Sequence, residues 1–394
     1  MANQALLPPV PAPRPAATET ERVLSERIFL FVSPRTPSIP TIGPQLHQQH
    51  GGLAVCRFDG LQKGGQQALA RYRGPLLLDP GRYEKHFATS DRPFIVPPDD
   101  MYGSGMDREL DLQIQRRALA AITPTGYIRA ADWGALKAVV RTAQDLKRND
   151  VVIMLPIDAA WLQDDSVEKL DLAIKQTPHP VAIAVGGQYN PFDKYRKATT
   201  NLRRLLIDNP GVGLWRADLQ VFDAIGHGAL FAAFGLSTSL RHTVPPDQAA
   251  QSKKGGGVRP SATVLLPELL RFSQGSDLAT LYADADAPTC SCLACGGAKL
   301  DRFDGHDNEI RALADSHNAA VWADLLVAVF HYTDLGSRQA WWHQLCIDAL
   351  KSIEAENERL RQVGAFKVPK DVQRWVDLPI THAPAPVPTP GRQP

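Results

Sequence analysis

The sequence predicts an α/β fold, with a closed (β/α)₈ barrel as the first choice and an open doubly wound sheet as the second. Two observations carry this prediction. Short runs of four to six apolar residues recur along the chain, as expected for strands buried on both faces of a parallel sheet. Helical patterns follow several of these runs, and repeated strand–helix units favour parallel strands joined by right-handed crossovers.

Seven of these runs are predicted to be strands: residues 28–32, 53–56, 75–78, 151–155, 181–185, 212–215 and 229–234. An eighth strand is expected at 94–96 or at 263–266, and the pattern does not choose between them. Apolar residues at helical spacing predict helices, several of which follow these strands, at 132–147, 167–174, 195–206 and 218–228. A further helix with mixed charges is expected at 340–362, on the outside of the domain.

Composition and missing motifs argue against several classes of protein. The 394 residues carry a formal net charge of +1, so any nucleic-acid binding must come from local patches. No GxGxxG motif follows the first strand and no GxxxxGK[ST] motif occurs, which argues against a dinucleotide-binding Rossmann domain and a P-loop nucleotidase. The N-terminus does not resemble a secretory signal, and there is no run of 18 apolar residues to span a membrane. We therefore expect a cytoplasmic protein.

Three of the five cysteines lie within six residues. Cys290, Cys292 and Cys295 form the pattern C-x-C-x₂-C, and His317 follows 22 positions after Cys295, at the expected start of an apolar helix. Clustered thiols with a downstream histidine are typical of a tetrahedral Cys₃His zinc site, which is structural because four protein ligands leave no open position. His306 is the rival fourth ligand, and buried free thiols are the alternative to a metal site.

The sequence also predicts where the parts of the chain begin and end. We expect a Pro-rich disordered arm at 1–22, the barrel at 23–275, a zinc-binding subdomain at 276–335, C-terminal helices at 336–382 and a disordered tail at 383–394. The stretch 251–260 (QSKKGGGVRP) is expected to be a flexible loop that is either solvated or in contact with phosphate.

Candidate catalytic side chains follow from the rule that active sites of parallel α/β folds gather at the C-terminal ends of the strands. Asp79, Asp158 and Asp218 lie at three such ends. Each has a structural alternative, because Asp79 before Pro-Gly suits a turn, and the other two precede helical segments that they would cap. Three carboxylates on one rim can divide into a nucleophile and a general acid/base once their environments separate their pKa values.

Other strand ends supply candidates for substrate binding. These residues are Gly186, Gly187, Gln188, Arg216, Arg241 and His242. The two glycines have the alternative of providing only a tight turn, and Arg241 and His242 that of being ordinary surface residues.

The C-x-C-x₂-C motif with His317-Asn318 downstream resembles the zinc motif of the tRNA-guanine transglycosylase superfamily, whose members have a (β/α)₈ barrel with a zinc-binding insertion near its C-terminal end. Further resemblances fall in the same order within residues 50–330, in the stretches PLLLDPGRY, VVIMLPID, VAIAVGGQ and VGLWRADLQVFDAIGHG. Only the zinc motif is specific by itself, and the other stretches gain weight from their order.

The resemblance implies base exchange at a nucleoside. In the family an aspartate attacks the anomeric carbon and expels guanine, a covalent glycosyl-enzyme forms, and a 7-deazaguanine then takes the place of guanine. By position, Asp79 matches the family's acid/base aspartate, Asp158 a base-recognition aspartate, and Gly186-Gly187 the backbone that holds the base. The implied cofactor is structural Zn²⁺, and the implied partners are nucleic acid and 7-cyano-7-deazaguanine or a relative.

The chain departs from the family at the nucleophile. The family carries it in a Phe-Asp stretch of the last barrel strand, and the matching residues 229–241 contain no aspartate, which leaves Asp218 as the substitute candidate. The family's Gln-Gly-Gly strand is missing or merged into residues 185–188. These departures resemble the diverged DNA-directed branch, the DpdA-type enzymes, which must extrude the target base. DNA is therefore favoured over tRNA, and partner proteins of a DNA-modification system belong to this hypothesis.

Two other hypotheses stay open. The first is a non-catalytic nucleic-acid-binding relative that keeps the barrel and the zinc group but has lost the nucleophile. The second is a barrel enzyme that acts on a small nucleoside or sugar. In the nucleic-acid hypotheses, phosphates would contact basic residues that the sequence places in loops and helices, namely Arg203, Arg204, Arg241, Lys253, Lys254 and Arg259.

Overall fold

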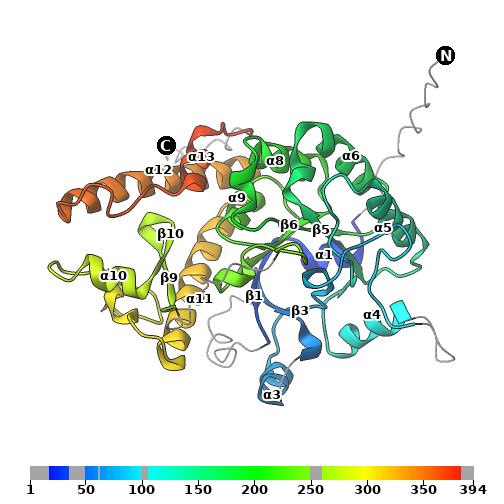
Figure 1. The fold of residues 1–394 in the computed structure, drawn as a ribbon, viewed down its shortest axis with the longest axis horizontal. Helices are drawn as coiled ribbons and strands as arrows, with labels where there is room; N and C mark the ends of the chain where they lie inside the picture. The colour runs from blue at the N-terminus through cyan, green and yellow to red at the C-terminus, as the bar shows by residue number, and fades with distance from the viewer. Residues whose placement is uncertain (1–16, 35–48, 61–62, 99–104, 249–259, 383–394) are drawn as a thin grey trace, which may run out of the picture.

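Eight parallel strands form a closed barrel in chain order, which confirms the predicted fold (Figure 1). The computed structural model describes residues 17–34, 49–60, 63–98, 105–248 and 260–382. β1 pairs with both β2 and β8, and these two pairings close the ring. The strands are β1 (Arg27–Val32), β2 (Gly51–Cys56), β3 (Leu76–Asp79), β4 (Ala121–Ile122), β5 (Val151–Asp158), β6 (Val181–Gly186), β7 (Val212–Ala217) and β8 (Phe231–Gly235).

β4 is the strand that the sequence patterns missed. It has only two residues, and it pairs in parallel with β3 and β5. Both predicted positions for the eighth strand were wrong. Phe94 forms a single antiparallel bridge with Thr125, and β9 (Thr263–Leu266) pairs antiparallel with β10 (Arg271–Gln274) in a separate sheet.

Helices surround the barrel. The helices predicted at 132–147, 167–174, 195–206 and 218–228 are present as α5, α6, α8 and α9. Asp132 begins α5 by accepting a hydrogen bond from the backbone N–H of Ala135, and Gly228, with φ of 90°, lies just beyond the end of α9. The helices up to β8 are α1 (Glu19–Leu24), α3 (Lys63–Arg71), α4 (Gly105–Gln115), α5 (Trp133–Asp145), α6 (Asp164–Lys175), α7 (Pro191–Lys194), α8 (Ala198–Asp208) and α9 (Gln220–Gly226).

α1 lies at the end of the arm that was expected to be disordered. Thr18 and Glu21 form a capping box at its N-terminus, which stabilises this short helix, so the prediction was wrong for residues 19–22. Residues 1–16 of the arm, residues 251–259 of the expected loop and the tail 383–394 lie outside the described residues.

Alternating side chains of the strands separate two apolar cores. Phe29 and Phe31 of β1 point into the barrel, where they pack edge-on against Phe231 and Trp215. Their neighbours on the same strand belong to the larger core between the strands and the helices. The barrel interior is therefore filled by side chains, as small barrels require, and ligands can reach only its ends.

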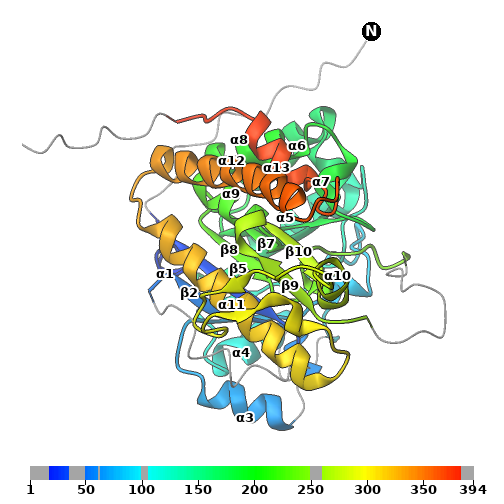
Figure 2. The same ribbon diagram turned by 90° about the vertical axis from the view of Figure 1, so that its left-hand side faces the viewer.

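The C-terminal third forms a lobe beside the barrel. Figure 2 shows α11 running past β9 and β10, and Figure 1 shows α12 reaching from this lobe to the side of the barrel near α9. α12 packs against α9 of the barrel and against α13. No helix among the described residues is long and apolar enough to cross a membrane. The helices of this region are α10 (Gly275–Leu281), α11 (Asn308–Phe330), α12 (Leu335–Arg359) and α13 (Lys370–Asp377).

Candidate functional site

Four buried side chains, Cys290, Cys292, Cys295 and His317, form a group that could hold a metal ion, with all four ligand atoms within 4.8 Å of one another. The three sulfur atoms lie 3.6, 3.5 and 3.2 Å from Nδ1 of His317. Zn–S and Zn–N bonds of ordinary length in a tetrahedral site separate sulfur and nitrogen by about 3.6 Å. The donor set and its spacing therefore fit a tetrahedral ion such as zinc. His306 is not part of the group.

Neighbouring groups orient these ligands. Nε2 of His317 lies 2.7 Å from the carbonyl oxygen of Leu265, so the ring donates from Nε2 and leaves Nδ1 for a metal. Asn318 holds the same strand, accepting from the N–H of Leu265 and donating to the carbonyl of Thr263. Arg302 donates to the sulfur of Cys295 at 3.1 Å. The histidine lies in the middle of α11, and not at its start as expected, so the helix itself fixes the ring against β9.

Asp79 ends β3 inside the barrel, with 1% of its surface exposed. One carboxylate oxygen accepts from the N–H of Gly81 at 2.7 Å, and the other accepts from the Tyr83 hydroxyl at 2.5 Å and the Trp215 indole at 2.9 Å. Burial raises the pKa of the Asp79 carboxyl, although these donors and Arg216 oppose the change. The turn expected at this position is present, and burial of the carboxyl favours its protonated form.

Two arginines converge on Glu84 above Asp79. Arg216 contacts Glu84 at 2.5 Å and donates to the carbonyl of Ser239 at 2.8 Å, and Arg57 contacts the other oxygen of Glu84 at 3.1 Å. Burial alone would raise the pKa of Glu84, but the two arginines outweigh it and hold this pKa below its ordinary value. Arg216 therefore lies at the barrel mouth as a paired charge.

Backbone in the left-handed region occurs at this end of the barrel, as it also does before β1 at Glu26 and before β4 at Arg117. Arg57, Gly81 and Arg216 follow or end β2, β3 and β7, and their φ angles are 50°, 63° and 54°. A residue other than glycine in the left-handed region costs about 1–3 kcal/mol, and such residues cluster at functional sites. Arg57 and Arg216 therefore combine strained backbone with ion pairs to Glu84.

Asp158 lies at the same end, where β5 stops. Its Oδ1 accepts from the N–H of Ala160 at 2.8 Å, so the carboxylate caps the helical turn Ala159–Leu162, as the structural alternative predicts. The Tyr127 hydroxyl donates to Oδ2 at 3.4 Å, and Nζ of Lys194 lies 4.0 Å from Oδ1. Because this carboxylate is partly exposed, it can still receive a ligand.

The end of β6 is covered by a neighbouring segment. Gly187 donates its N–H to the carbonyl of Thr243 at 3.0 Å, so in this conformation that N–H is not available to hold a base. His242 lies beside Gln188, and burial, assisted by a neighbouring positive charge, lowers the pKa of His242 to about 4. The imidazole is therefore neutral at physiological pH. Gly186 pairs with Thr243 as well, which closes the site over both glycines.

Asp218 lies after β7, in a groove of about 320 Å³ between the barrel and the segment that leads into α13. It accepts from the N–H of Gln220 at 3.1 Å, and burial raises its pKa. Asp371 of α13 lines the same groove, where it binds Asn190 and Arg374. Burial and the charge of Asp218 raise the pKa of Asp371 to about 7. The two carboxyl groups therefore form an electrostatically coupled pair.

Arg241 is a buried side chain, so the alternative of an ordinary surface residue was wrong for it. Its guanidinium lies 3.2 Å from the centre of the Phe272 ring, and it donates long hydrogen bonds to the carbonyls of Gly235 and Leu236. Burial lowers the pKa of Arg241 to about 9, while Asp218 opposes the change, so the guanidinium stays charged at neutral pH.

The end of β8 has no space for a side chain. A Cβ atom on Gly235 would lie 2.3 Å from the carbonyl oxygen of Leu240. An aspartate at the last position of β8 would therefore require the following turn to move. This geometry agrees with the absence of an aspartate from residues 229–241.

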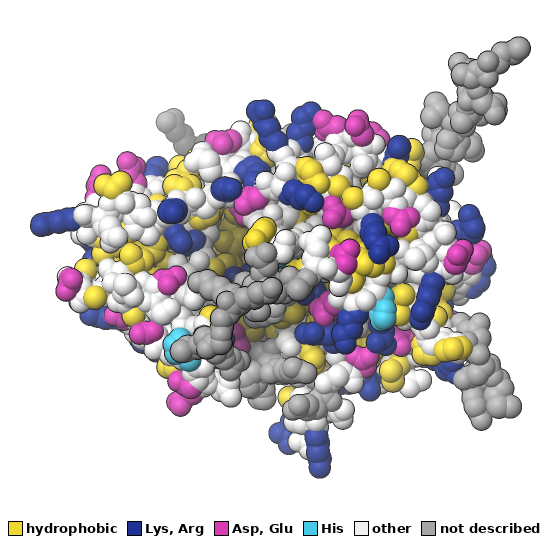
Figure 3. All heavy atoms as spheres, viewed as in Figure 1, with side chains coloured by type: hydrophobic (Ala, Val, Ile, Leu, Met, Phe, Trp, Pro, Cys, Tyr) yellow, Lys and Arg dark blue, Asp and Glu magenta, His cyan; other side chains and the backbone are white. Residues whose placement is uncertain are grey.

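The predicted phosphate contacts are only partly available. Arg203 is buried in an ion pair with Asp223 at 2.6 Å, so the prediction that it contacts phosphate was wrong. Arg204 pairs with Glu168 at 2.7 Å on the surface. Lys253, Lys254 and Arg259 lie outside the described residues. In Figure 3, Lys and Arg side chains are scattered among Asp and Glu on the face shown, so this view contains no patch of a single sign.

The three predicted aspartates share one end of the barrel but lie in different environments: Asp79 in the interior, Asp158 at a cap and Asp218 in a side groove. Sequence reasoning missed Glu84 and Asp371. Glu84 follows Asp79 by five residues and was within reach of the same motif, whereas no pattern connects α13 to β7. Comparisons with known proteins give no relative, since no family model and no curated protein sequence matches the chain.

Proposed function

We propose that this protein is a transglycosylase that exchanges guanine for a 7-deazaguanine base in nucleic acid, with DNA favoured over tRNA. The observation that supports this most is the combination of a closed (β/α)₈ barrel with a Cys₃His group following its eighth strand. The buried Asp79 carboxyl, at the C-terminal end of β3, supports the rim as the reaction site.

In this proposal the reaction proceeds in two displacements. The Asp218 carboxylate attacks the anomeric carbon, the glycosidic bond breaks, and guanine leaves with a proton supplied by Asp79. The ring nitrogen of the incoming 7-deazaguanine then attacks the same carbon, which breaks the ester to Asp218, and its proton passes to Asp79. Asp158 binds the base. Asp79 must first exchange its contact with Tyr83 for one with the substrate.

Zinc in the Cys₃His group is structural in this proposal, because four protein ligands leave no open coordination position. Cys290, Cys292, Cys295 and His317 would hold the ion and so join residues 290–295 to α11 and β9 within the C-terminal lobe. The proposed reaction uses Asp79, Asp158 and Asp218 and does not involve the ion.

The test is a parallel assay with DNA and tRNA. The protein is expected to exchange labelled guanine, or to insert 7-cyano-7-deazaguanine, into one of the two polymers. Asp218→Asn and Asp79→Asn should each reduce the rate by at least 100-fold, as loss of a nucleophile or of a general acid does. Asp284→Asn, an exposed aspartate of the C-terminal lobe, is the matched control and should leave the rate unchanged. Absence of exchange on both polymers would refute the proposal.

A second candidate is a non-catalytic nucleic-acid-binding relative, which is favoured by Gly235. Residues 229–241, which match the stretch that carries the family's nucleophile, contain no aspartate, and Gly235 at the end of β8 has no space for a side chain. Such a protein would bind DNA or RNA with an affinity that falls steeply with salt, and would form no covalent adduct. A covalent protein–nucleic acid adduct that is trapped with the wild type and lost in Asp218→Ala would exclude it.

A further inference from the structure

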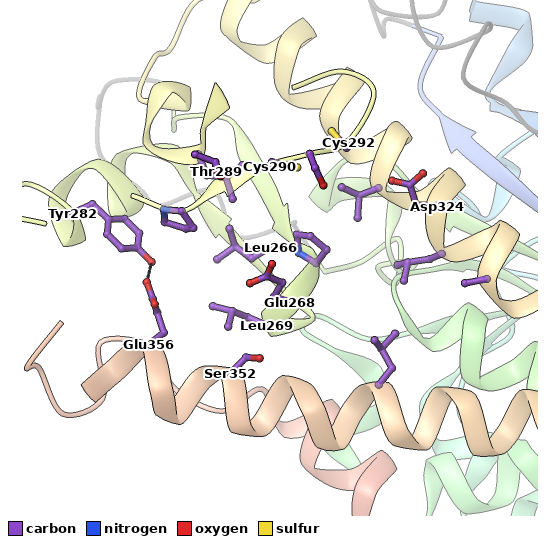
Figure 4. Close-up of a pocket in the computed structure, with 18 of the residues that line it drawn as sticks. Leu266, Glu268, Leu269, Tyr282, Thr289, Cys290, Cys292, Asp324, Ser352 and Glu356 are labelled. Atoms are coloured by element: carbon purple, nitrogen blue, oxygen red, sulfur yellow. Dashed lines mark hydrogen bonds between the residues drawn. The ribbon is translucent and has the colours of Figure 1, made fainter. Parts of the chain in front are cut away.

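A cavity of about 380 Å³ lies beside the Cys₃His group, away from the rim of the barrel. Four elements form its walls: the turn between β9 and β10, the segment that carries Cys290 and Cys292, α11 and α12 (Figure 4). Its volume lies in the range of about 300–1,000 Å³ that is typical of small-molecule sites. None of the rim candidates lines it, so the cavity is separate from the proposed reaction site.

The walls combine apolar surface with carboxylates. Leu266, Leu269, Val321, Trp341 and Leu345 supply aliphatic and aromatic contacts. This lining suits an apolar body of moderate size, because the surface removed from water on binding is mostly hydrocarbon.

The charged groups around the cavity are all acidic. Glu268, Asp324 and Glu356 line it, and none of the described lining residues is Lys, Arg or His. Glu356 is offset by Arg359 and by the Tyr282 hydroxyl. For Glu268 and Asp324 the described part of the chain offers no ion pair or hydrogen bond, so their charges are uncompensated at the cavity.

We propose that this cavity binds a small organic cation with an apolar body, such as an arylalkylamine. The apolar walls receive the body, and Glu268 and Asp324, which approach from the β9–β10 turn and from α11, attract the ammonium group (Figure 4). Anionic ligands, including nucleotides and phosphate, are disfavoured here because they would face Glu268 and Asp324, and none of the described lining residues is a Lys, Arg or His.

The test compares two probes that share one apolar body and differ in charge. Phenethylamine is expected to bind saturably to the full chain and to shift the indole signal of Trp341 in NMR spectra, whereas 3-phenylpropionate is not. The double variant Glu268→Gln/Asp324→Asn should weaken phenethylamine about tenfold, since each partly screened charge contributes a small amount. Both side chains are exposed, so these changes leave the fold intact.

Two matched variants complete the test. Glu354→Gln removes an exposed carboxylate of α12 that does not line the cavity, and it should leave binding unchanged. Ala328→Phe places an aromatic ring in the cavity and should abolish binding. The proposal is overturned if phenethylamine does not bind, if both probes bind equally, or if the double variant and Glu354→Gln behave alike.

Discussion

The carboxyl group of Asp79 is accommodated inside the barrel by three donors, and its titration should be visible in the stability of the protein. Burial raises the pKa of this group above its value in the unfolded chain, so the unfolded state gives up the proton at lower pH than the folded state does. The contribution of Asp79 to the free energy of unfolding therefore decreases as pH rises from about 4 through the raised pKa.

Asp79→Asn removes this titration while it keeps an acceptor for Gly81 or Trp215. Relative to the wild type, the free energy of unfolding of the variant should increase as pH rises from about 4 through the raised pKa of Asp79. Denaturant unfolding at several pH values measures this difference. Asp284→Asn, which removes an exposed carboxyl, is the control and should show no such change. A difference that is the same at every pH would contradict the expectation.

Gly235 tests whether the end of β8 can carry a side chain. Gly235→Ala should destabilise the protein by about 2 kcal/mol or more, because the new Cβ would lie 2.3 Å from the Leu240 carbonyl oxygen. Gly134→Ala is the matched control, since its Cβ would meet only atoms at 3.6 Å, and in α5 it should be neutral or stabilising by up to about 1 kcal/mol. Thermal or denaturant unfolding compares the two. Equal stability would show that the turn after β8 yields easily.

At the scale of elements, the docking of α13 on the barrel should depend on pH. The pKa of Asp371 is raised to about 7, chiefly by burial and then by the charge of Asp218. A carboxyl with a higher pKa in the docked helix than in the free helix favours docking while it is protonated. Protection of α13 amides from hydrogen exchange should therefore fall as pH rises from about 4 to about 7, after correction for the intrinsic exchange rate.

Two variants separate the causes of this pH dependence. Asp218→Asn removes the second charge and should make the protection of α13 less sensitive to pH. Asp377→Asn changes an exposed aspartate on α13 itself and should leave the dependence as it is in the wild type. Equal protection at about pH 4 and about pH 7 in the wild type would refute the raised pKa of Asp371, and an unchanged pH dependence in Asp218→Asn would refute its coupling to Asp218.

The elements differ in how far the sequence could predict them. Seven strands were recognised because each contains a run of apolar residues long enough to be buried on both faces. β4 was missed because two residues carry no period, and their place is set by the strands on either side. β9 contains an apolar run as well, but it pairs with the antiparallel β10 and not with a barrel strand. The residues of a strand do not show which other strand it pairs with.

The candidate site was predictable to a similar extent. Close spacing within the chain located the three cysteines, and His317 completes their group. The rule for strand ends located Asp79, Asp158 and Asp218 at one end of the barrel. It could not show that the N–H of Gly187 is occupied by Thr243, or that Asp371 faces Asp218, because these contacts join segments far apart in sequence.

At the scale of the whole molecule, the Cys₃His group links segments within the C-terminal lobe, because its ligands come from residues 290–295 and α11, and His317 contacts β9. A chelator under reducing conditions should increase hydrogen exchange in β9, residues 289–299 and the middle of α11, while β1–β8 stay protected. Metal binding by such groups contributes about 10–16 kcal/mol in small zinc domains, so its loss permits local unfolding. His317→Ala should reproduce the pattern without a chelator, whereas His306→Ala should retain metal and protection. Exchange that rises equally in the barrel would contradict this division.

The pairing of β1 with β8 has a consequence for synthesis on the ribosome. The first rung of this pairing joins Arg27 to Phe231, about 200 residues later in the chain. At about 5–20 residues per second, the ribosome takes roughly 10–40 s to make the intervening segment. Throughout that time β1 presents an unpaired edge to other nascent chains, and unpaired edges are templates for aggregation. Slow translation before residue 231 should therefore lower the yield of soluble protein more than the same delay placed after residue 235.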